Sequence, residues 1–192
     1  MKKSIMIIAV LAFFTQVFAA RYAQDAGSYQ LGGNFGFESK GGDLYKNADD
    51  DRETTITISP ELSYFLIEGL SFGVKMNYTR TSQGDVTNTD LGFGPALSFY
   101  LGNSRSIVYP YLTGAYFFNS DKMKMKTAIG DQEIKSNSQQ IYLGAGALYM
   151  VSNAVGMNIE LFYRIDKTKP DGGESRNVNV FGIMVGFQSF IF

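Results

Sequence analysis

The chain has 192 residues, enough for one domain, and carries 17 lysines and arginines against 18 aspartates and glutamates, a formal net charge of −1. This balance gives no support for nucleic-acid binding, whose affinity rests on cationic side chains. The absence of cysteine and histidine excludes disulfides, thiolate chemistry, acylation of a cysteine and the commonest general base.

The amino-terminal segment is predicted to be a secretory signal spanning residues 1–19. Met1-Lys2-Lys3 is a short positive segment, and the apolar run Ile5–Phe18 is shorter than the about 20 residues that a spanning helix needs. Small residues follow at Val17-Phe18-Ala19, so we expect cleavage after Ala19 or Ala20. A retained membrane anchor is the alternative.

Beyond this signal, alternating apolar and polar residues predict eight β-strands. Each segment matches the 9–11 or so residues of a tilted transmembrane strand and exceeds the five or six of an ordinary one. The segments are Ser28–Glu38, Thr54–Phe65, Leu70–Arg80, Asn88–Tyr100, Ile107–Asn119, Gln139–Met150, Val155–Asp166 and Asn177–Phe192.

Two of these strands are harder to place than the others. The segment Ile107–Asn119 is apolar on both faces, so its orientation stays open. In the last segment the alternation slips near Val180-Phe181, which predicts a β-bulge.

The connections between the segments alternate in length. The longer ones, which hold most of the charges, are Ser39–Glu53, Thr81–Thr87, Ser120–Ser138 and Lys167–Arg176, and the short ones are Ile67–Gly69, Leu101–Ser106 and Val151–Ala154. Aromatic residues gather near both strand ends, as in the two girdles of a membrane barrel: Tyr64, Phe99, Tyr149, Phe190 and Phe192 at one, Phe37, Tyr78 and Tyr163 at the other.

Together these features predict the all-β class: an eight-stranded antiparallel up-and-down transmembrane β-barrel over residues 28–192, after a periplasmic segment at 20–27. Short turns alternating with long outer loops are typical of the Gram-negative outer membrane. An even strand number places both termini in the periplasm and four loops outside. The alternative is a secreted lipocalin-like barrel, which would turn its apolar faces inward.

The segment Tyr64–Tyr78 and the ending Phe187–Phe192 resemble the small outer-membrane barrel families, namely the outer-membrane protein β-barrel domain group and the OmpA-barrel and OmpX/Ail-like proteins. The resemblance lies in the alternating pattern of the strands and in the aromatic carboxy terminus, and no residue-exact motif supports it. It implies that Phe192, with Phe190, is a signal for the barrel-assembly machinery, and that periplasmic chaperones act during biogenesis. It also implies a structural or surface-interaction role, with lipopolysaccharide, outer-membrane lipids and host or extracellular ligands as partners.

The composition argues against catalysis. Enzymes known among small outer-membrane barrels use a catalytic histidine, which this chain lacks. A zinc site without histidine or cysteine would have to be all-carboxylate, contrary to the usual ligand set. We therefore expect no catalytic residue, cofactor or metal site.

Four charges are predicted to face the interior: Glu61, Lys75, Glu160 and Arg164. Glu61 and Lys75 lie equally far from the Ile67–Gly69 turn, so they should oppose each other, and Lys75 should also approach Glu160 across the barrel. Eight strands leave an interior that side chains fill, which favours a structural salt-bridge cluster over a gate or proton relay.

The outer connections hold two further charged motifs. Asp49-Asp50-Asp51 lacks the spaced ligands and glycine of a calcium loop, which favours a solvated acidic tip over a cation site. Lys122, Lys124 and Lys126 alternate with methionines, which predicts a hairpin extending above the membrane. Its basic edge either contacts anionic phosphate or discourages aggregation.

The function expected is non-enzymatic, an adhesin or envelope-integrity barrel. The alternative is a narrow pore for small or apolar solutes.

Overall fold

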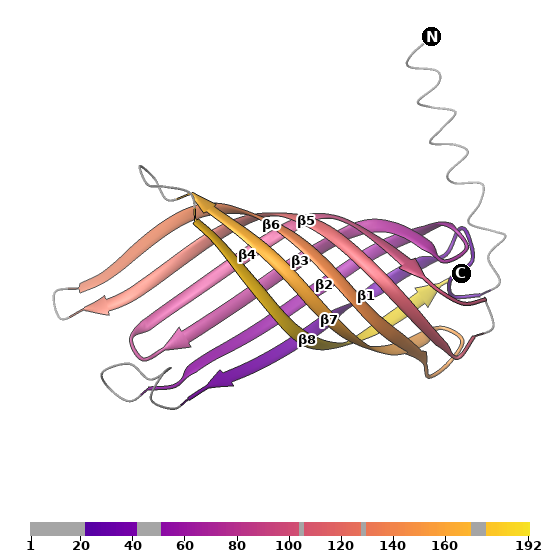
Figure 1. The fold of residues 1–192 in the computed structure, drawn as a ribbon, viewed down its shortest axis with the longest axis horizontal. Coiled ribbons are helices and arrows are strands. Elements are labelled where there is room, and N and C mark those ends of the chain that lie inside the picture. The colour runs from indigo at the N-terminus through magenta and orange to yellow at the C-terminus, as the bar shows by residue number, and fades with distance from the viewer. Residues whose placement is uncertain (1–21, 42–50, 104–105, 128–129, 170–175) are drawn as a thin grey trace, which may run out of the picture.

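The computed structural model of the chain describes residues 22–41, 51–103, 106–127, 130–169 and 176–192. Each strand pairs antiparallel with the next, and β1 pairs with β8, so the sheet closes into a barrel (Figure 1). The strands are β1 (Tyr29–Lys40), β2 (Glu53–Ile67), β3 (Leu70–Gln83), β4 (Val86–Tyr100), β5 (Val108–Thr127), β6 (Gly130–Met150), β7 (Val155–Lys169) and β8 (Arg176–Ile191). The predicted fold class is confirmed.

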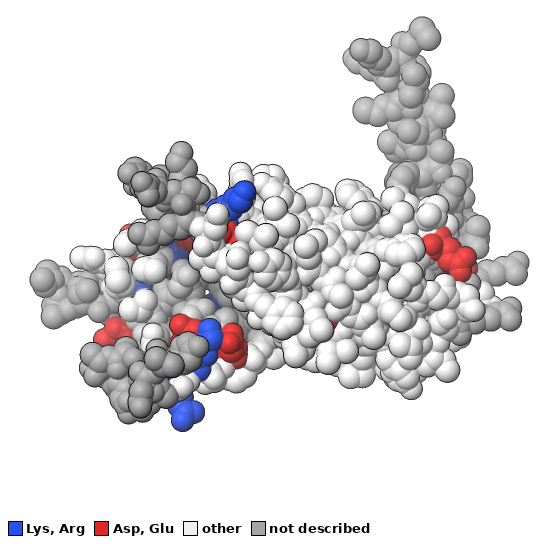
Figure 2. Space-filling model, viewed as in Figure 1, with Lys and Arg blue, Asp and Glu red and all other residues white. Residues whose placement is uncertain are grey.

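Apolar side chains cover the outside of the barrel, opposite to the arrangement in a soluble protein. Exposed apolar residues occupy the outward face of every strand, including Leu31, Leu62, Val74, Leu97, Leu112, Leu143, Ile159 and Val185. Figure 2 shows a broad uncharged zone with the charges near the two ends of the molecule. This is the surface that a bilayer covers, and it contradicts the lipocalin-like alternative. In the part of the chain described, no helix is long and apolar enough to cross a membrane.

Several strands run further than the sequence pattern predicted. The segment Thr81–Thr87 is mostly paired strand, with a two-residue turn at Gly84-Asp85 where Gly84 has φ +52°. The segment Ser120–Ser138 is also mostly strand, because β5 and β6 pair as far as Thr127 and Gly130. The loop prediction was wrong for Thr81–Thr87, because alternation fades once both faces of a hairpin are polar, although backbone pairing continues. The pairing over Ser120–Ser138 agrees with the hairpin that the alternating lysines and methionines predicted.

The predicted bulge in β8 is absent from the described residues. The β7–β8 register runs unbroken from Val155↔Ser189 to Thr168↔Arg176. The pattern slips because β8 places apolar residues on both faces at its outer end, with Phe181 exposed and Val180 half-buried. A register shift occurs instead between β2 and β3, beside the turn after Ile67.

The residues before β1 close one end of the barrel. Ala23 and Gln24 are buried, and backbone hydrogen bonds join Gly69 to Gln24 and Phe65 to Ser28. This segment lies at the end where the chain also finishes (Figure 1). We call it the terminal end, and we call the opposite end, where β1–β2, β3–β4, β5–β6 and β7–β8 connect, the hairpin end.

Candidate functional site

The centre of the barrel holds a buried cluster of three charged residues. Glu61 and Lys75 are direct partners in the β2–β3 register, and Lys75 Nζ lies 3.6 Å from Glu61 Oε2 and 3.7 Å from Glu160 Oε1. All three side chains are almost fully buried. The two contacts expected of Lys75 are therefore present, one along the sheet and one across the lumen.

Neutral donors complete the surroundings of Glu160. Its Oε1 accepts hydrogen bonds from Asn34 Nδ2 at 3.0 Å and from the Tyr142 hydroxyl, and its Oε2 accepts one from the Tyr111 hydroxyl at 2.8 Å. Asn158 donates to Asn34 and to Tyr111 in turn. A buried carboxylate with this many donors is well compensated for its lost hydration.

Lys75 and Glu61 have fewer partners than Glu160. The ammonium group of Lys75 lies 4.7 Å from the centroid of the Tyr142 ring, a cation–π distance, and Glu61 accepts a hydrogen bond from the Ser63 hydroxyl at 2.6 Å. One cation thus serves two buried carboxylates. Removal of that cation would leave both without an opposite charge in a dry interior.

Glycines on the lumen face make room for these long side chains. A Cβ at Gly144 would come within 3.0 Å of Glu160 Cδ, and one at Gly146 within 2.8 Å of the Tyr111 ring. Small residues at these two positions therefore leave space for the charged cluster and its tyrosine donors.

Arg164 is the one predicted member that lies outside the cluster. Its Nε is 3.4 Å from Asp166 Oδ2, nearer the hairpin end, and Gln140 donates to the same Asp166 carboxylate at 2.7 Å. The alternation places Arg164 correctly on the inner face. On β7, however, Arg164 lies four residues beyond Glu160 toward the hairpin end, where Asp166 is its acidic partner.

Aromatic and apolar side chains fill the lumen on both sides of the charged cluster. Toward the terminal end, a cluster of buried residues packs ring against ring, with Phe65 lying 5.7 Å from Tyr100 and 6.2 Å from Phe190 between centroids. Toward the hairpin end, Tyr142 stacks on Phe162 at 5.7 Å and meets Phe117 edge-on at 6.1 Å. We call these the terminal plug and the upper plug.

The terminal plug corrects one part of the predicted girdle. Phe190 is 3% exposed and lies in the lumen, whereas Ile191 faces outward at 62% exposure and Phe192 is exposed. Phe190 therefore does not belong to the outer aromatic girdle. The alternation of β8 is regular here, so Ile191 shares the outward face with Phe187.

A hollow of about 630 Å³ opens above the upper plug, and its lining includes Asp90, Asp121, Asp166 and Arg164. We call it the vestibule. The next outward pair toward the hairpin end is Thr89 and Lys122, which are polar, and the next one toward the terminal end contains Leu91, so the Asp90↔Asp121 pair lies at the outer boundary of the apolar belt. Burial, followed by the negative charge of Asp121, raises the pKa of Asp90 to about 7. Burial likewise raises the pKa of Asp121.

Sequence reasoning missed the tyrosines of the central cluster. Tyr111 lies on β5, whose two faces are both apolar, so its inward direction had no signal in the pattern. Tyr142 faces inward by the alternation of β6, but its contacts to Glu160 and Lys75 depend on the curvature of the closed barrel. Asn34 and Asn158 lie on opposite sides of the β1–β8 seam, and their contact likewise follows from closure.

The outer charged motifs are only partly described. Asp49, Asp50 and the side chain of Lys126 lie outside the described residues. Lys122 pairs with Glu133 at 2.8 Å on the extended β5–β6 hairpin, where the sequence predicted such an extension. Among the described residues, no group of three or more acidic side chains is arranged to hold a metal ion.

Comparison with known proteins extends the description of the barrel. No curated protein matches the sequence. Among solved structures, Neisserial surface protein A is 17% identical with a TM-score of 0.52, covering 85% of this chain and 97% of its own. The N-terminal barrel of Pseudomonas aeruginosa OprF is 12% identical with a TM-score of 0.51, covering 88% and 100%. These likenesses show the fold. A family model matches residues 6–188, nearly the whole chain, and by this match the protein belongs to the outer membrane protein beta-barrel domain family of the bacterial outer membrane.

Proposed function

We propose that this protein is a non-enzymatic outer-membrane barrel with a structural or surface-interaction role, of the adhesin or envelope-integrity type. The observation that carries the proposal is the filled lumen, in which the charged cluster lies between the terminal and upper plugs. Because side chains fill the interior, we expect the outer wall and the hairpin end to be the surfaces that contact other molecules.

The hairpin end is the stronger candidate for such contacts. The β5–β6 hairpin extends beyond the belt and carries charged side chains on its outward face, and Figure 2 shows charges of both signs gathered at this end. We place this end outside the cell and both termini in the periplasm. An epitope tag inserted between Gly84 and Asp85 tests the orientation, because it should bind antibody on intact cells.

Solute flux tests whether the filled lumen is closed. Protein refolded into liposomes, with folding verified by a gel band that shifts on boiling, should pass small sugars and ions no faster than protein-free liposomes. An open porin refolded in parallel shows that the assay detects flux. Flux well above background in the correctly folded protein would instead support the alternative, a narrow pore for small solutes.

The assembly signal is a separate part of the proposal. Phe192 is exposed at the terminal end, while Phe190 packs on Phe65, so we assign recognition by the barrel-assembly machinery and its chaperones to Phe192. Phe192→Ala should slow appearance of the heat-shifting band in cells but leave refolding into detergent unchanged. Phe190→Ala should slow both without preventing folding, because it removes one ring of the terminal plug.

A further inference from the structure

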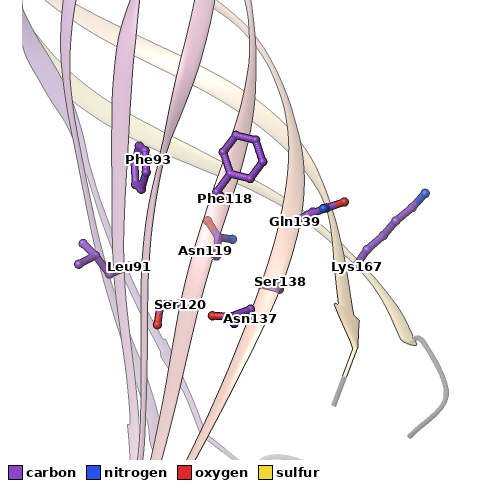
Figure 3. Close-up of a pocket in the computed structure, with 9 residues that line it drawn as sticks. All are labelled: Leu91, Phe93, Phe118, Asn119, Ser120, Asn137, Ser138, Gln139 and Lys167. Carbon is purple, nitrogen blue, oxygen red and sulfur yellow. The ribbon is translucent and has the colours of Figure 1, made fainter. Parts of the chain in front are cut away.

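A groove of about 660 Å³ crosses the outer wall of the barrel over β4–β7 (Figure 3). One row of paired residues runs along it, in the order Phe93, Phe118, Gln139 and Lys167. The groove is therefore apolar at β4 and basic at β7. Because the strands of such barrels tilt by about 35–45°, a row of this kind crosses the edge of the apolar belt obliquely.

The apolar part of the groove is formed by two aromatic rings on the outside of the barrel. Phe93 is 59% exposed and Phe118 is 51% exposed, and their centroids are 6.4 Å apart. Figure 3 shows the two rings beside each other on neighbouring strands. Exposed aromatic rings at the belt edge match the boundary between acyl chains and headgroups.

The polar part of the groove carries a cation without a counter-charge. Lys167 is exposed, forms no ion pair with any residue that the structure describes, and extends away from the strands in Figure 3. Ser120, Asn137 and Gln139 add neutral hydrogen-bonding groups. Further out on the same face, Lys122 and Lys135 share a single acid, Glu133. The face above the groove therefore has an excess of positive charge.

We propose that this groove binds a lipid with an anionic phosphate headgroup. An acyl chain would lie along Phe93 and Phe118, and the phosphate would pair with Lys167 and accept hydrogen bonds from the neighbouring polar side chains. Charge complementarity and position at the belt edge favour a lipid, since each lysine near the membrane surface contributes about 1 kcal/mol toward anionic lipids. This inference goes beyond the proposed function, because the groove lies on the outer wall and requires no ligand at the hairpin end.

Tryptophan fluorescence tests the site directly, because the chain has no tryptophan. Phe118→Trp places a single reporter in the groove, and the protein is refolded into phosphatidylcholine vesicles containing phosphatidic acid. Two preparations are compared, one in which the phosphatidic acid has brominated acyl chains and one in which the phosphatidylcholine has them. Bromine quenches the fluorescence of a nearby indole. We expect brominated phosphatidic acid to bind beside Trp at 118 about fivefold more strongly than brominated phosphatidylcholine, the equivalent of about one lysine contact.

Two controls separate the site from the general lipid shell. Phe35→Trp reports from β1, where the paired residues Ile58 and Val185 are apolar, and it should show no preference between the lipids. In the Phe118→Trp background, Lys167→Gln should remove most of the preference. Arg80→Gln, which removes an exposed rim cation on β3 outside the groove, should keep it.

The proposal is overturned by any of three results in correctly folded protein. Equal quenching by both lipids at position 118 means that the groove has no headgroup selectivity. An equal preference at position 35 means that the whole wall attracts anionic lipid. A preference that survives Lys167→Gln means that the lysine does not bind the phosphate.

Discussion

At the scale of single residues, Lys75 is the most consequential charge in the barrel. It is the cation shared by Glu61 and Glu160. Lys75→Met keeps the length of the side chain but leaves two buried carboxylates without a cation, so we expect the free energy of unfolding to fall by about 3–5 kcal/mol. Urea unfolding in detergent micelles, followed by circular dichroism, measures the loss.

A matched variant distinguishes burial from charge in this experiment. Lys135, on the outside of the β5–β6 hairpin, is also paired with a glutamate, but its side chain is 73% exposed. Lys135→Met should change the stability by no more than about 0.5 kcal/mol, as is usual for surface pairs. Equal losses in the two variants would show that the central cluster adds no stability beyond that of a surface ion pair.

The vestibule predicts a dependence of stability on pH. The folded pKa of Asp90, about 7, lies above its ordinary value of 3.8, so between these values the folded state holds a proton that the unfolded state has released. Stability therefore falls as the pH rises from about 4 to 7. Asp90→Asn removes the share of this loss that comes from Asp90. The gain in unfolding free energy over the wild-type protein should therefore be larger at pH 8 than at pH 4, by at least about 1 kcal/mol.

The control for Asp90 is another carboxylate at the same end. Asp85→Asn removes one negative charge from the β3–β4 turn, outside the vestibule lining. Unfolding curves at pH 4 and pH 8 should still show the wild-type loss of stability in this variant. If the two substitutions flatten the profile equally, the effect is one of net charge at the hairpin end and the Asp90–Asp121 pair is not its source.

At the scale of strands, the contact of β4 with β5 depends on one glycine. A Cβ at Gly94 would collide with the backbone carbonyl oxygen of Tyr116, and backbone cannot move aside as a side chain does. Gly94→Ala should therefore cost more than about 2 kcal/mol. At Gly114 on β5, the nearest atom to a Cβ is 3.8 Å away, so Gly114→Ala should be nearly neutral in the same unfolding assay. Similar losses at the two positions would rule out a close strand contact at Gly94.

The strands also show how far the sequence determines the structure. The membrane-spanning parts were predictable because lipid on one side and a filled lumen on the other impose period-two alternation, and Glu61 opposes Lys75 by simple counting from a turn. The direction of Tyr111 had no such signal. Nor did the contact between Asn34 and Glu160, which are 126 residues apart, because it depends on closure of the barrel.

At the scale of the whole molecule, the terminal plug, the charged cluster and the upper plug block one lumen in series. A path opens only when every barrier in it is removed, so Lys75→Ala alone should leave liposome flux at background. Phe65→Ala combined with Phe190→Ala should do the same, because Phe117, Tyr142 and Phe162 still close the upper end. The heat-shifted gel band verifies that each variant is folded. Flux through Lys75→Ala alone would show that the two plugs do not block the lumen. The central cluster would then be the barrier that controls passage of solutes.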